Sequence, residues 1–283
     1  GKKVLTVYRR GQLPNRDDVA RHLVNYPRLV YNLTNDALFD VDAVDVLYPY
    51  WIDGRSDHNP KTDEEDAVRF RDAGRGMEYE FDAIAFKAAG ASRILTYHPH
   101  FHREPGVIDV KGIEVVCLDA VPGMIRYAKD KLGISGNCLV INPDMKPKKE
   151  GKYDIAFEFA KLGDFDLSHM EKMRVDTKSV EHKTQLDAQG RDVVIVDDIG
   201  STFSTLGGAV DNIYNAKSVD ILVVHPVLTQ DGHKRARALM IRDEKRVRSI
   251  QGTHTIDSDF SRISIEDEIA NFYNGSENYR VKA

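Results

Sequence analysis

One stretch of the sequence, residues 192–205, constrains the fold more than any other. It reads Asp-Val-Val-Ile-Val-Asp-Asp-Ile-Gly-Ser-Thr-Phe-Ser-Thr. Four apolar residues that favour β-structure lead into two adjacent carboxylates, and a hydroxyl-rich loop follows. An apolar pattern at helical spacing then begins, carried by Leu206, Val210, Ile213 and Tyr214. The stretch therefore predicts a strand, an acidic turn, a loop and a helix.

The composition of this loop is that of a phosphate site. Amide groups in the first turn of a helix have no intrahelical partners, and the helix dipole makes that end positive. Hydroxyl donors come from Ser201, Thr202, Ser204 and Thr205. The carboxylates of Asp197 and Asp198 can accept hydrogen bonds from sugar hydroxyls or hold a hydrated divalent metal. A phosphate beside a diol describes ribose 5-phosphate; the simpler alternative is that the two aspartates only cap the helix.

Length and composition allow one large domain or two ordinary ones. The 283 residues are 41% hydrophobic, which is enough to build buried cores. The net charge is −5, so the composition does not indicate a basic surface that would bind nucleic acid. No apolar run is long enough for a signal peptide or a membrane span, so we expect a cytoplasmic protein with no membrane partner. Cys117 and Cys138 lie in apolar, strand-like runs and are expected to be buried free thiols.

Helices, glycines and strands alternate along the chain. The periodicity predicts strands at 4–8, 43–48, 93–97, 137–141 and 218–224, and helices at 16–25, 81–88, 121–131, 155–162 and 263–272. Glycines 90, 133 and 163 are expected to end three of these helices. Such alternation implies crossover connections, and therefore an α/β fold of parallel sheets with helices on both faces. We expect two domains, 1–135 and 136–283, with ligands bound beyond the carboxyl ends of the strands.

Three histidines, His98, His100 and His102, occupy alternate positions after the strand at 93–97. An extended segment would place all three on one face, where they could hold a metal or meet phosphates. Pro99 disturbs this alternation, and for His98 and His102 a surface position with no role is an equally good interpretation.

Several other residues could carry chemistry. Asp144 directly follows a predicted strand and is either a site carboxylate or an ordinary turn aspartate. Lys172 and Arg174 stand two apart in a hairpin-like flap expected at 170–186, so they share a side and could close over a triphosphate. They could equally be solvated flap residues. Arg55 and Asp57 lie in a long polar loop of the kind that often binds ligands.

Taken together, these segments resemble the ribose-phosphate pyrophosphokinase family, the synthetases of phosphoribosyl pyrophosphate (PRPP), and the short archaeal type most closely. The similarity runs from about Val46 to the last helix. It implies two similar type I phosphoribosyltransferase domains, each a mainly parallel sheet flanked by helices. It also implies ATP and ribose 5-phosphate as substrates, Mg²⁺ as cofactor, and a homodimer or larger homo-oligomer.

The resemblance assigns roles to the residues that match family motifs. Residues 193–205 are similar to the PRPP loop, so Asp197 and Asp198 would orient the ribose hydroxyls, and the loop hydroxyls would hold the 5-phosphate. The remaining matches are Arg55 and Asp57 in the ATP-binding segment, His100 on metal and ATP phosphates, Asp144 in the metal-binding turn, and Lys172 and Arg174 in the catalytic flap. Residues 253–255, Thr-His-Thr, resemble a Thr-Asp-Thr segment of the family.

The sequence also departs from the family pattern. Phe203 and Ser204 stand where small residues, commonly glycine, let the backbone approach phosphate, and a bulky residue with positive φ costs about 1–3 kcal/mol. Lys146 and Pro147 replace expected glycines, and a Phe-Pro-Asp-Gly-Glu segment near the family's N-terminus is absent from these residues. The open alternatives are a regulatory paralogue that associates with an active synthetase, a nucleotide-sensing module, and a phosphoribosyltransferase, against which the His100 and Lys172 matches argue.

Overall fold

The computed structural model describes residues 2–7, 10–11, 16–35, 40–52, 78–143, 153–170, 172–174, 180–182, 185–241 and 247–275. The chain divides into two compact units, one of residues 1–118 and 272–283 and the other of residues 119–271. We expected the boundary after residue 135. It falls earlier, so helix α4 (Val121–Leu132) belongs to the second unit.

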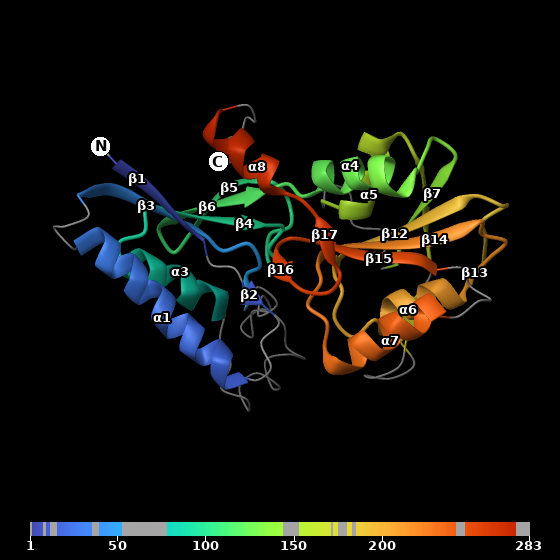
Figure 1. Cartoon of the computed structure of the whole chain (residues 1–283), viewed down its shortest axis with the longest axis horizontal. Helices are drawn as coiled ribbons and strands as arrows, with labels where there is room; N and C mark the ends of the chain where they lie inside the picture. Colours follow the sequence, from blue (N-terminus) through green and yellow to red (C-terminus); the bar gives the residue numbers. More distant parts are fainter. Residues whose placement is uncertain are drawn as a thin grey trace. The chain divides into compact units, whose positions relative to one another are not determined.

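The first unit is built on a five-stranded sheet. Its order is β1 (Lys2–Val7), β3 (Val41–Leu47), β4 (Arg93–Tyr97), β6 (Ile113–Leu118) and β5 (Gly106–Val110). All neighbouring strands are parallel except β5, which pairs antiparallel with β6. Helices α1 (Arg16–Asn35) and α3 (Glu78–Ala88) pack beside this sheet (Figure 1), and the short strand β2 is Arg10–Gly11. The C-terminal segment joins this unit because the Tyr273 hydroxyl donates to Asp45 at 2.8 Å.

The second unit is built on a six-stranded, fully parallel sheet. Its order is β17 (Ser261–Ile263), β15 (Val247–Thr253), β14 (Ser218–His225), β12 (Asp192–Ile199), β7 (Cys138–Asn142) and β8 (Asp166–His169). Helices α4 and α5 (Ile155–Gly163) cover one face, and α6 (Ser204–Asp211) and α7 (Gln230–Ile241) cover the other (Figure 1). The remaining elements are β9 (Lys172–Arg174), β10 (Val180–His182), β11 (Leu186–Asp187), β13 (Ile213–Tyr214), β16 (Ile256–Asp257) and α8 (Glu266–Tyr273).

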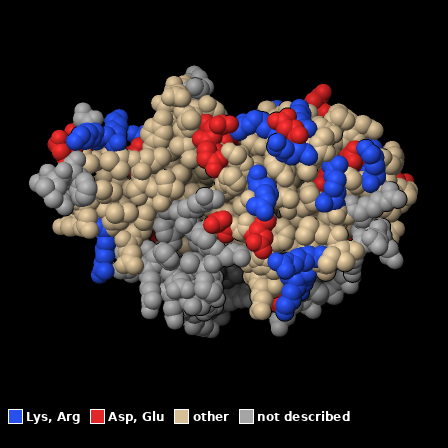
Figure 2. Space-filling model, in the orientation of Figure 1, with Lys and Arg blue, Asp and Glu red and all other residues tan. Residues whose placement is uncertain are grey.

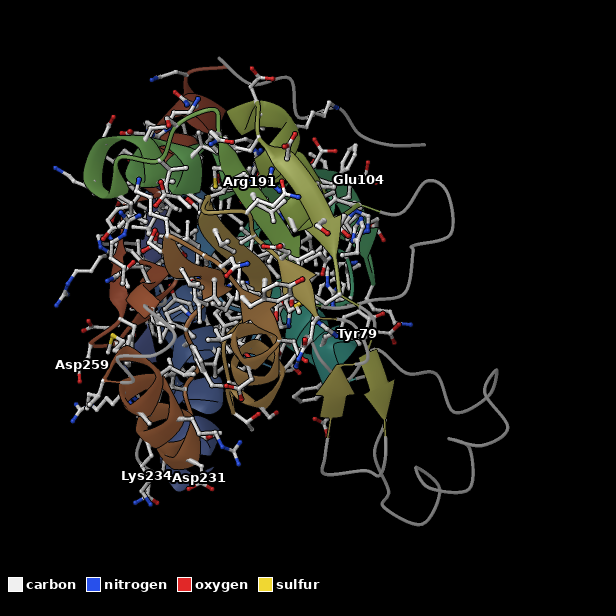
Figure 3. All side chains as sticks on the ribbon, turned by 90° about the vertical axis from the view of Figure 1, so that its right-hand side faces the viewer. Tyr79, Glu104, Arg191, Asp231, Lys234 and Asp259 are labelled. Atoms are coloured by element: carbon white, nitrogen blue, oxygen red, sulfur yellow. The ribbon has the colours of Figure 1, made fainter. Side chains whose placement is uncertain are left out.

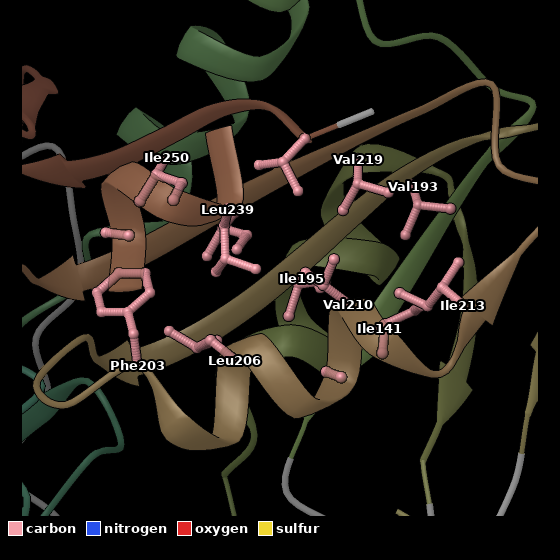
Figure 4. Packing of buried hydrophobic residues seen from close by; sticks show 14 of the residues in the cluster. Ile141, Val193, Ile195, Phe203, Leu206, Val210, Ile213, Val219, Leu239 and Ile250 are labelled. Carbon is pink, nitrogen blue, oxygen red and sulfur yellow. The ribbon is translucent and has the colours of Figure 1, made fainter. Parts of the chain in front are cut away.

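The apolar run before Asp197 forms the centre of this sheet. Val193 to Val196 are almost fully buried, and β12 pairs with β14 on one side and β7 on the other. In Figure 4, Phe203, Leu206 and Val210 on the α6 side and Leu239 on α7 pack against the strands. These helical positions are three and four residues apart, so they share one face of α6. The predicted α/β fold of two units with mainly parallel sheets is confirmed, and residues 197–205 lie at the carboxyl end of a central strand.

Three local predictions were wrong. Helix α6 ends at Asp211, because Ile213 and Tyr214 pair with β11 as a short strand instead of continuing the helix. Gly163 lies inside α5, and Asp164 takes the left-handed cap with φ 58°. A Cβ at Gly163 would lie 2.1 Å from the Phe165 ring, so glycine makes room for that ring. The last helix begins at Glu266, because residue 263 ends strand β17.

Cys117 and Cys138 are both buried and unbridged, as predicted. In the described ranges, none of the helices is long and apolar enough to cross a membrane. Figure 2 shows basic and acidic side chains interspersed over the visible face of the second unit.

Candidate active site

The acidic pair lies in the last part of β12. Asp197 is half-buried and Asp198 is buried, with 8% of its surface exposed. The Asp198 amide donates to the Asp197 carboxylate at 2.8 Å. Neither carboxylate caps the next helix, because the cap residue of α6 is Phe203. The capping interpretation is therefore wrong, and the pair lies where the strand opens into the loop.

Phe203 has the backbone conformation usually left to glycine. Its φ is 58° and its ψ is 17°, in the left-handed region. Its side chain is 2% exposed and points from the start of α6 into the core, toward Leu239 and Ile250 (Figure 4). Gly200 makes room for the ring, since a Cβ there would be 3.0 Å from the Phe203 Cε2 atom. The bulky side chain therefore belongs to the core.

The hydroxyl-bearing residues of the loop are less buried than Phe203. Thr202 is exposed, and Ser201, Ser204 and Thr205 are half-buried. The Thr202 and Ser204 hydroxyl oxygens are 2.9 Å apart. The first amides of α6 lie beside them and lack intrahelical acceptors. Amides and hydroxyls at a helix N-terminus can together bind a phosphate monoester.

The neighbouring strand supports the loop through His225, which sequence reasoning missed. The His225 carbonyl, at the end of β14, accepts the Gly200 amide at 3.0 Å. Its ring is buried, with Nδ1 3.0 Å from the Thr255 hydroxyl. The Thr253 and Thr255 hydroxyls also donate to the Val224 carbonyl. The available signal was the His-Pro pair at the end of a predicted strand, together with the Thr-His-Thr segment at 253–255.

His254, in the turn after β15, contacts the start of α8. Its Nδ1 lies 2.8 Å from a Glu266 carboxylate oxygen, and the Ser264 hydroxyl bonds the other oxygen. Partial burial acts to raise the pKa of Glu266, but hydrogen bonds from Ser264 and His254 outweigh it and lower the pKa to about 2. A carboxyl whose pKa is lower in the folded chain stabilises the fold above its unfolded pKa.

We therefore expect Glu266→Gln to destabilise the protein at neutral pH by roughly 0.5 kcal/mol, because the carboxylate is more than half exposed and screened. The difference from wild type should shrink as the pH falls from the ordinary value of 4.5 toward 2, where Glu266 itself becomes protonated. Urea unfolding at several pH values measures this. A difference that grows on acidification would contradict the assignment.

The three histidines of the first unit do not share one extended face, in agreement with the disturbing effect expected of Pro99. Strand β4 ends at Tyr97, and His98 turns the chain with φ 34°. His98 is fully buried, and its Nδ1 lies 2.6 Å from the Arg103 carbonyl. The Arg103 guanidinium lies 2.8 Å from Nδ1 of His100, which is partly exposed. Among the residues that the structure describes, no three His, Cys, Asp or Glu side chains gather as a metal site.

The other predicted site residues fall wholly or partly outside the described part of the chain. Arg55, Asp57 and Asp144 lie in ranges that are not described. The backbones of Lys172 and Arg174 belong to β9, which pairs antiparallel with β10, so the predicted hairpin is confirmed. The roles of these five side chains stay predictions.

Comparisons with known proteins bear on both the fold and the family. No protein-family model matches the chain. It is 27% identical over 261 residues to the ribose-phosphate pyrophosphokinase of Methanobrevibacter smithii, covering 87% of this chain and 78% of that protein. It is 28% identical to the Methanothermobacter thermautotrophicus protein of the same name, covering 87% and 77%. Its fold matches the crystal structure of a PRPP synthetase from Mycobacterium smegmatis with a TM-score of 0.64 and 19% identity, covering 97% of this chain and 81% of that one.

Two units with parallel sheets, an acidic strand end and a helix-terminal loop define a protein with the type I phosphoribosyltransferase fold. Several archaeal relatives match over most of both chains. Over most of its length, the chain is therefore similar to ribose-phosphate pyrophosphokinases.

Proposed function

We propose that the protein transfers the diphosphoryl group of ATP to the C1 hydroxyl of ribose 5-phosphate, giving PRPP and AMP. The observation that carries the proposal is the conformation of Phe203. Its left-handed backbone keeps the loop in the shape that glycine usually provides, and its buried ring leaves the loop hydroxyls outside the core. The loop of this chain can therefore accept a phosphate despite its unusual residue.

The acidic strand end and the loop would bind different parts of ribose 5-phosphate. Ser201, Thr202, Ser204 and Thr205 would hold the 5-phosphate together with the first amides of α6. Asp197 and Asp198 would accept hydrogen bonds from the ribose hydroxyls. The C1 oxygen then attacks the β-phosphorus of ATP, and the bond between that phosphorus and the α,β-bridging oxygen breaks to release AMP. Positioning and charge neutralisation supply most of the catalysis of such a transfer.

The residues proposed around ATP come from the family resemblance. Lys172 and Arg174 would close over the transferred group, and Arg55 and Asp57 would contact the nucleotide. Of these residues the structure describes only the hairpin backbone at Lys172 and Arg174. We propose that the chain acts as a homodimer or larger homo-oligomer, as the family resemblance implies, and that it works in the cytoplasm.

Mg²⁺ is the proposed cofactor, with His100 and Asp144 as the residues that would hold it. The Arg103 cation lies beside the His100 ring and would repel a metal ion held by protein ligands alone. A metal ion that arrives bound to phosphate oxygens is therefore favoured. Mg²⁺ commonly keeps several waters and takes one or two carboxylates with substrate phosphates, so this chemistry fits a Mg²⁺–ATP complex. When bound, the ion would neutralise triphosphate charge.

AMP formation from ATP, Mg²⁺ and ribose 5-phosphate tests the function. We expect one AMP for each PRPP, and no AMP when ribose 5-phosphate is omitted. A folded protein that binds ribose 5-phosphate without forming AMP would defeat the enzyme proposal and favour a regulatory paralogue. PRPP consumption with a nucleobase would instead identify a phosphoribosyltransferase.

A further inference from the structure

The outer side of the phosphate loop, residues 200–204, is attached to helix α7. The Thr229 amide donates to the Ser201 carbonyl at 3.3 Å. The Arg235 guanidinium donates to the next carbonyl, that of Thr202, at 3.1 Å. Thr229 also caps α7, because its hydroxyl accepts the Gly232 amide at 3.0 Å. Two successive loop carbonyls are therefore held by the first two turns of one helix.

Gly232 allows this close approach. A Cβ at this position would lie 1.9 Å from the Ser201 carbonyl oxygen, far inside contact distance. Glycine in the first turn of α7 carries a helix-propensity cost of about 1 kcal/mol relative to alanine. The close packing of Ser201 against α7 explains why only glycine fits there.

Holding these carbonyls fixes where the loop amides point. The peptide bonds of the described residues are all trans, and in a trans peptide the C=O and N–H groups point in opposite directions. Because the Ser201 and Thr202 carbonyls face α7, the amides of Thr202 and Phe203 face away from it. Two successive amides are thereby turned to the side opposite α7, which suits an anion.

Arg235 differs from the neighbouring basic residues of α7 in its hydrogen-bond and ion-pair partners. Its neighbours Lys234 and Arg237 have carboxylate partners in Asp231, at 3.8 Å, and Asp259, at 3.3 Å. Asp231, Lys234 and Asp259 lie at the exposed outer side of this region (Figure 3). Within the described ranges, Arg235 forms no ion pair with a carboxylate, and its hydrogen bond goes to the loop. Its positive charge therefore stays directed at the phosphate loop.

We infer that Arg235 is a positioning residue for ribose 5-phosphate: it holds the Thr202 carbonyl so that the loop amides face the 5-phosphate, and Gly232 provides the close contact that this requires. The inference rests on the proposed function in one respect, namely that the loop's ligand is the 5-phosphate of that substrate. The inference adds a residue on α7, outside the loop itself, to those that determine how ribose 5-phosphate binds.

Arg235→Ala is expected to raise KM for ribose 5-phosphate about tenfold, with KM for ATP and kcat within about twofold of wild type. Arg235→Lys should recover part of this loss, because a lysine can still donate to the carbonyl. Arg237→Ala, on the same helix but paired with Asp259, is the matched control and should behave as wild type. Unchanged KM in Arg235→Ala, or an equal rise in KM for ATP, would overturn the inference.

A second pair of variants tests the contact at Gly232. Gly232→Ala must displace the Ser201 carbonyl and should raise KM for ribose 5-phosphate at least as much as Arg235→Ala. Gly207→Ala is its control, because a Cβ there would make an ordinary contact at 3.8 Å with Leu239. Hydrogen exchange of residues 200–205 should quicken in Gly232→Ala and Arg235→Ala, but not in the two controls.

Calorimetric titration with ribose 5-phosphate in the absence of ATP separates this inference from the proposed function. If the wild type binds but forms no AMP, the enzyme proposal fails, and a binding constant weakened about tenfold in Arg235→Ala still supports the inference. If wild type and Arg235→Ala bind equally well, or neither binds, the inference is overturned.

Discussion

Phe203→Gly is expected to lower the free energy of unfolding by about 2–4 kcal/mol. Two effects oppose each other. Removing the ring, which is 2% exposed, costs about 3–5 kcal/mol through lost burial and the cavity left behind. Relief of the left-handed backbone, at φ 58°, returns at most about 1 kcal/mol, because glycine also gives the unfolded chain more freedom. The buried ring therefore dominates, and urea unfolding followed by circular dichroism measures the difference.

A control separates backbone strain from burial. Gln189 also has a positive φ, 53°, but its side chain is exposed. Gln189→Gly should change the stability by less than about 0.5 kcal/mol, because strain relief is offset by the greater freedom of the unfolded chain. A Phe203→Gly variant as stable as wild type would show that the ring does not anchor the loop to the core.

This balance explains how the proposed phosphate loop can keep its backbone shape without the usual glycine. Glycine provides a positive φ at no steric cost but contributes nothing to the core. Phe203 accepts the strained conformation and gains a large buried surface with Leu206 and Leu239. Phenylalanine in place of glycine thus adds backbone strain at this position but also adds packing in the core. Phe203, the residue expected to weaken the loop, thus attaches the loop to the core.

The sequence predicted those features that depend on local patterns. The apolar run before Asp197 predicted a strand, and the helical spacing that begins at Leu206 predicted a helix after the loop. The flap hairpin was visible as two mixed runs around a polar turn. Each of these signals is a short, continuous stretch of sequence, so none required knowledge of tertiary contacts.

Features that depend on distant partners escaped prediction. Ile213 fits the helical period of α6, but its pairing with Leu186 on β11 makes it a strand residue. His98 was expected at the surface or on a metal, yet it is buried with its ring on the Arg103 carbonyl. The attachment of Thr202 to Arg235 joins residues 33 positions apart. Tertiary contacts overrode local preference in each case.

Lys172→Ala is expected to lower kcat by about 10²–10³-fold while the dissociation constants of ATP and ribose 5-phosphate change little. Negative charge on the transferred diphosphoryl group must be stabilised during transfer, and a flap cation would supply that stabilisation mainly in the transition state. The confirmed hairpin of β9 and β10 gives this cation a defined strand position, with Lys172 opposite His182 and Arg174 opposite Val180. AMP formation measures kcat, and calorimetry measures the two dissociation constants.

The matched control lies between the two cations. Met173 is the middle residue of β9, and its substitution leaves both cations in place. Met173→Ala should retain kcat within about twofold if charge is what matters. An equal loss in Met173→Ala would assign the effect to the fold of the hairpin. Full activity in Lys172→Ala would remove this lysine from the mechanism, and Arg174 would then be the flap cation left to test.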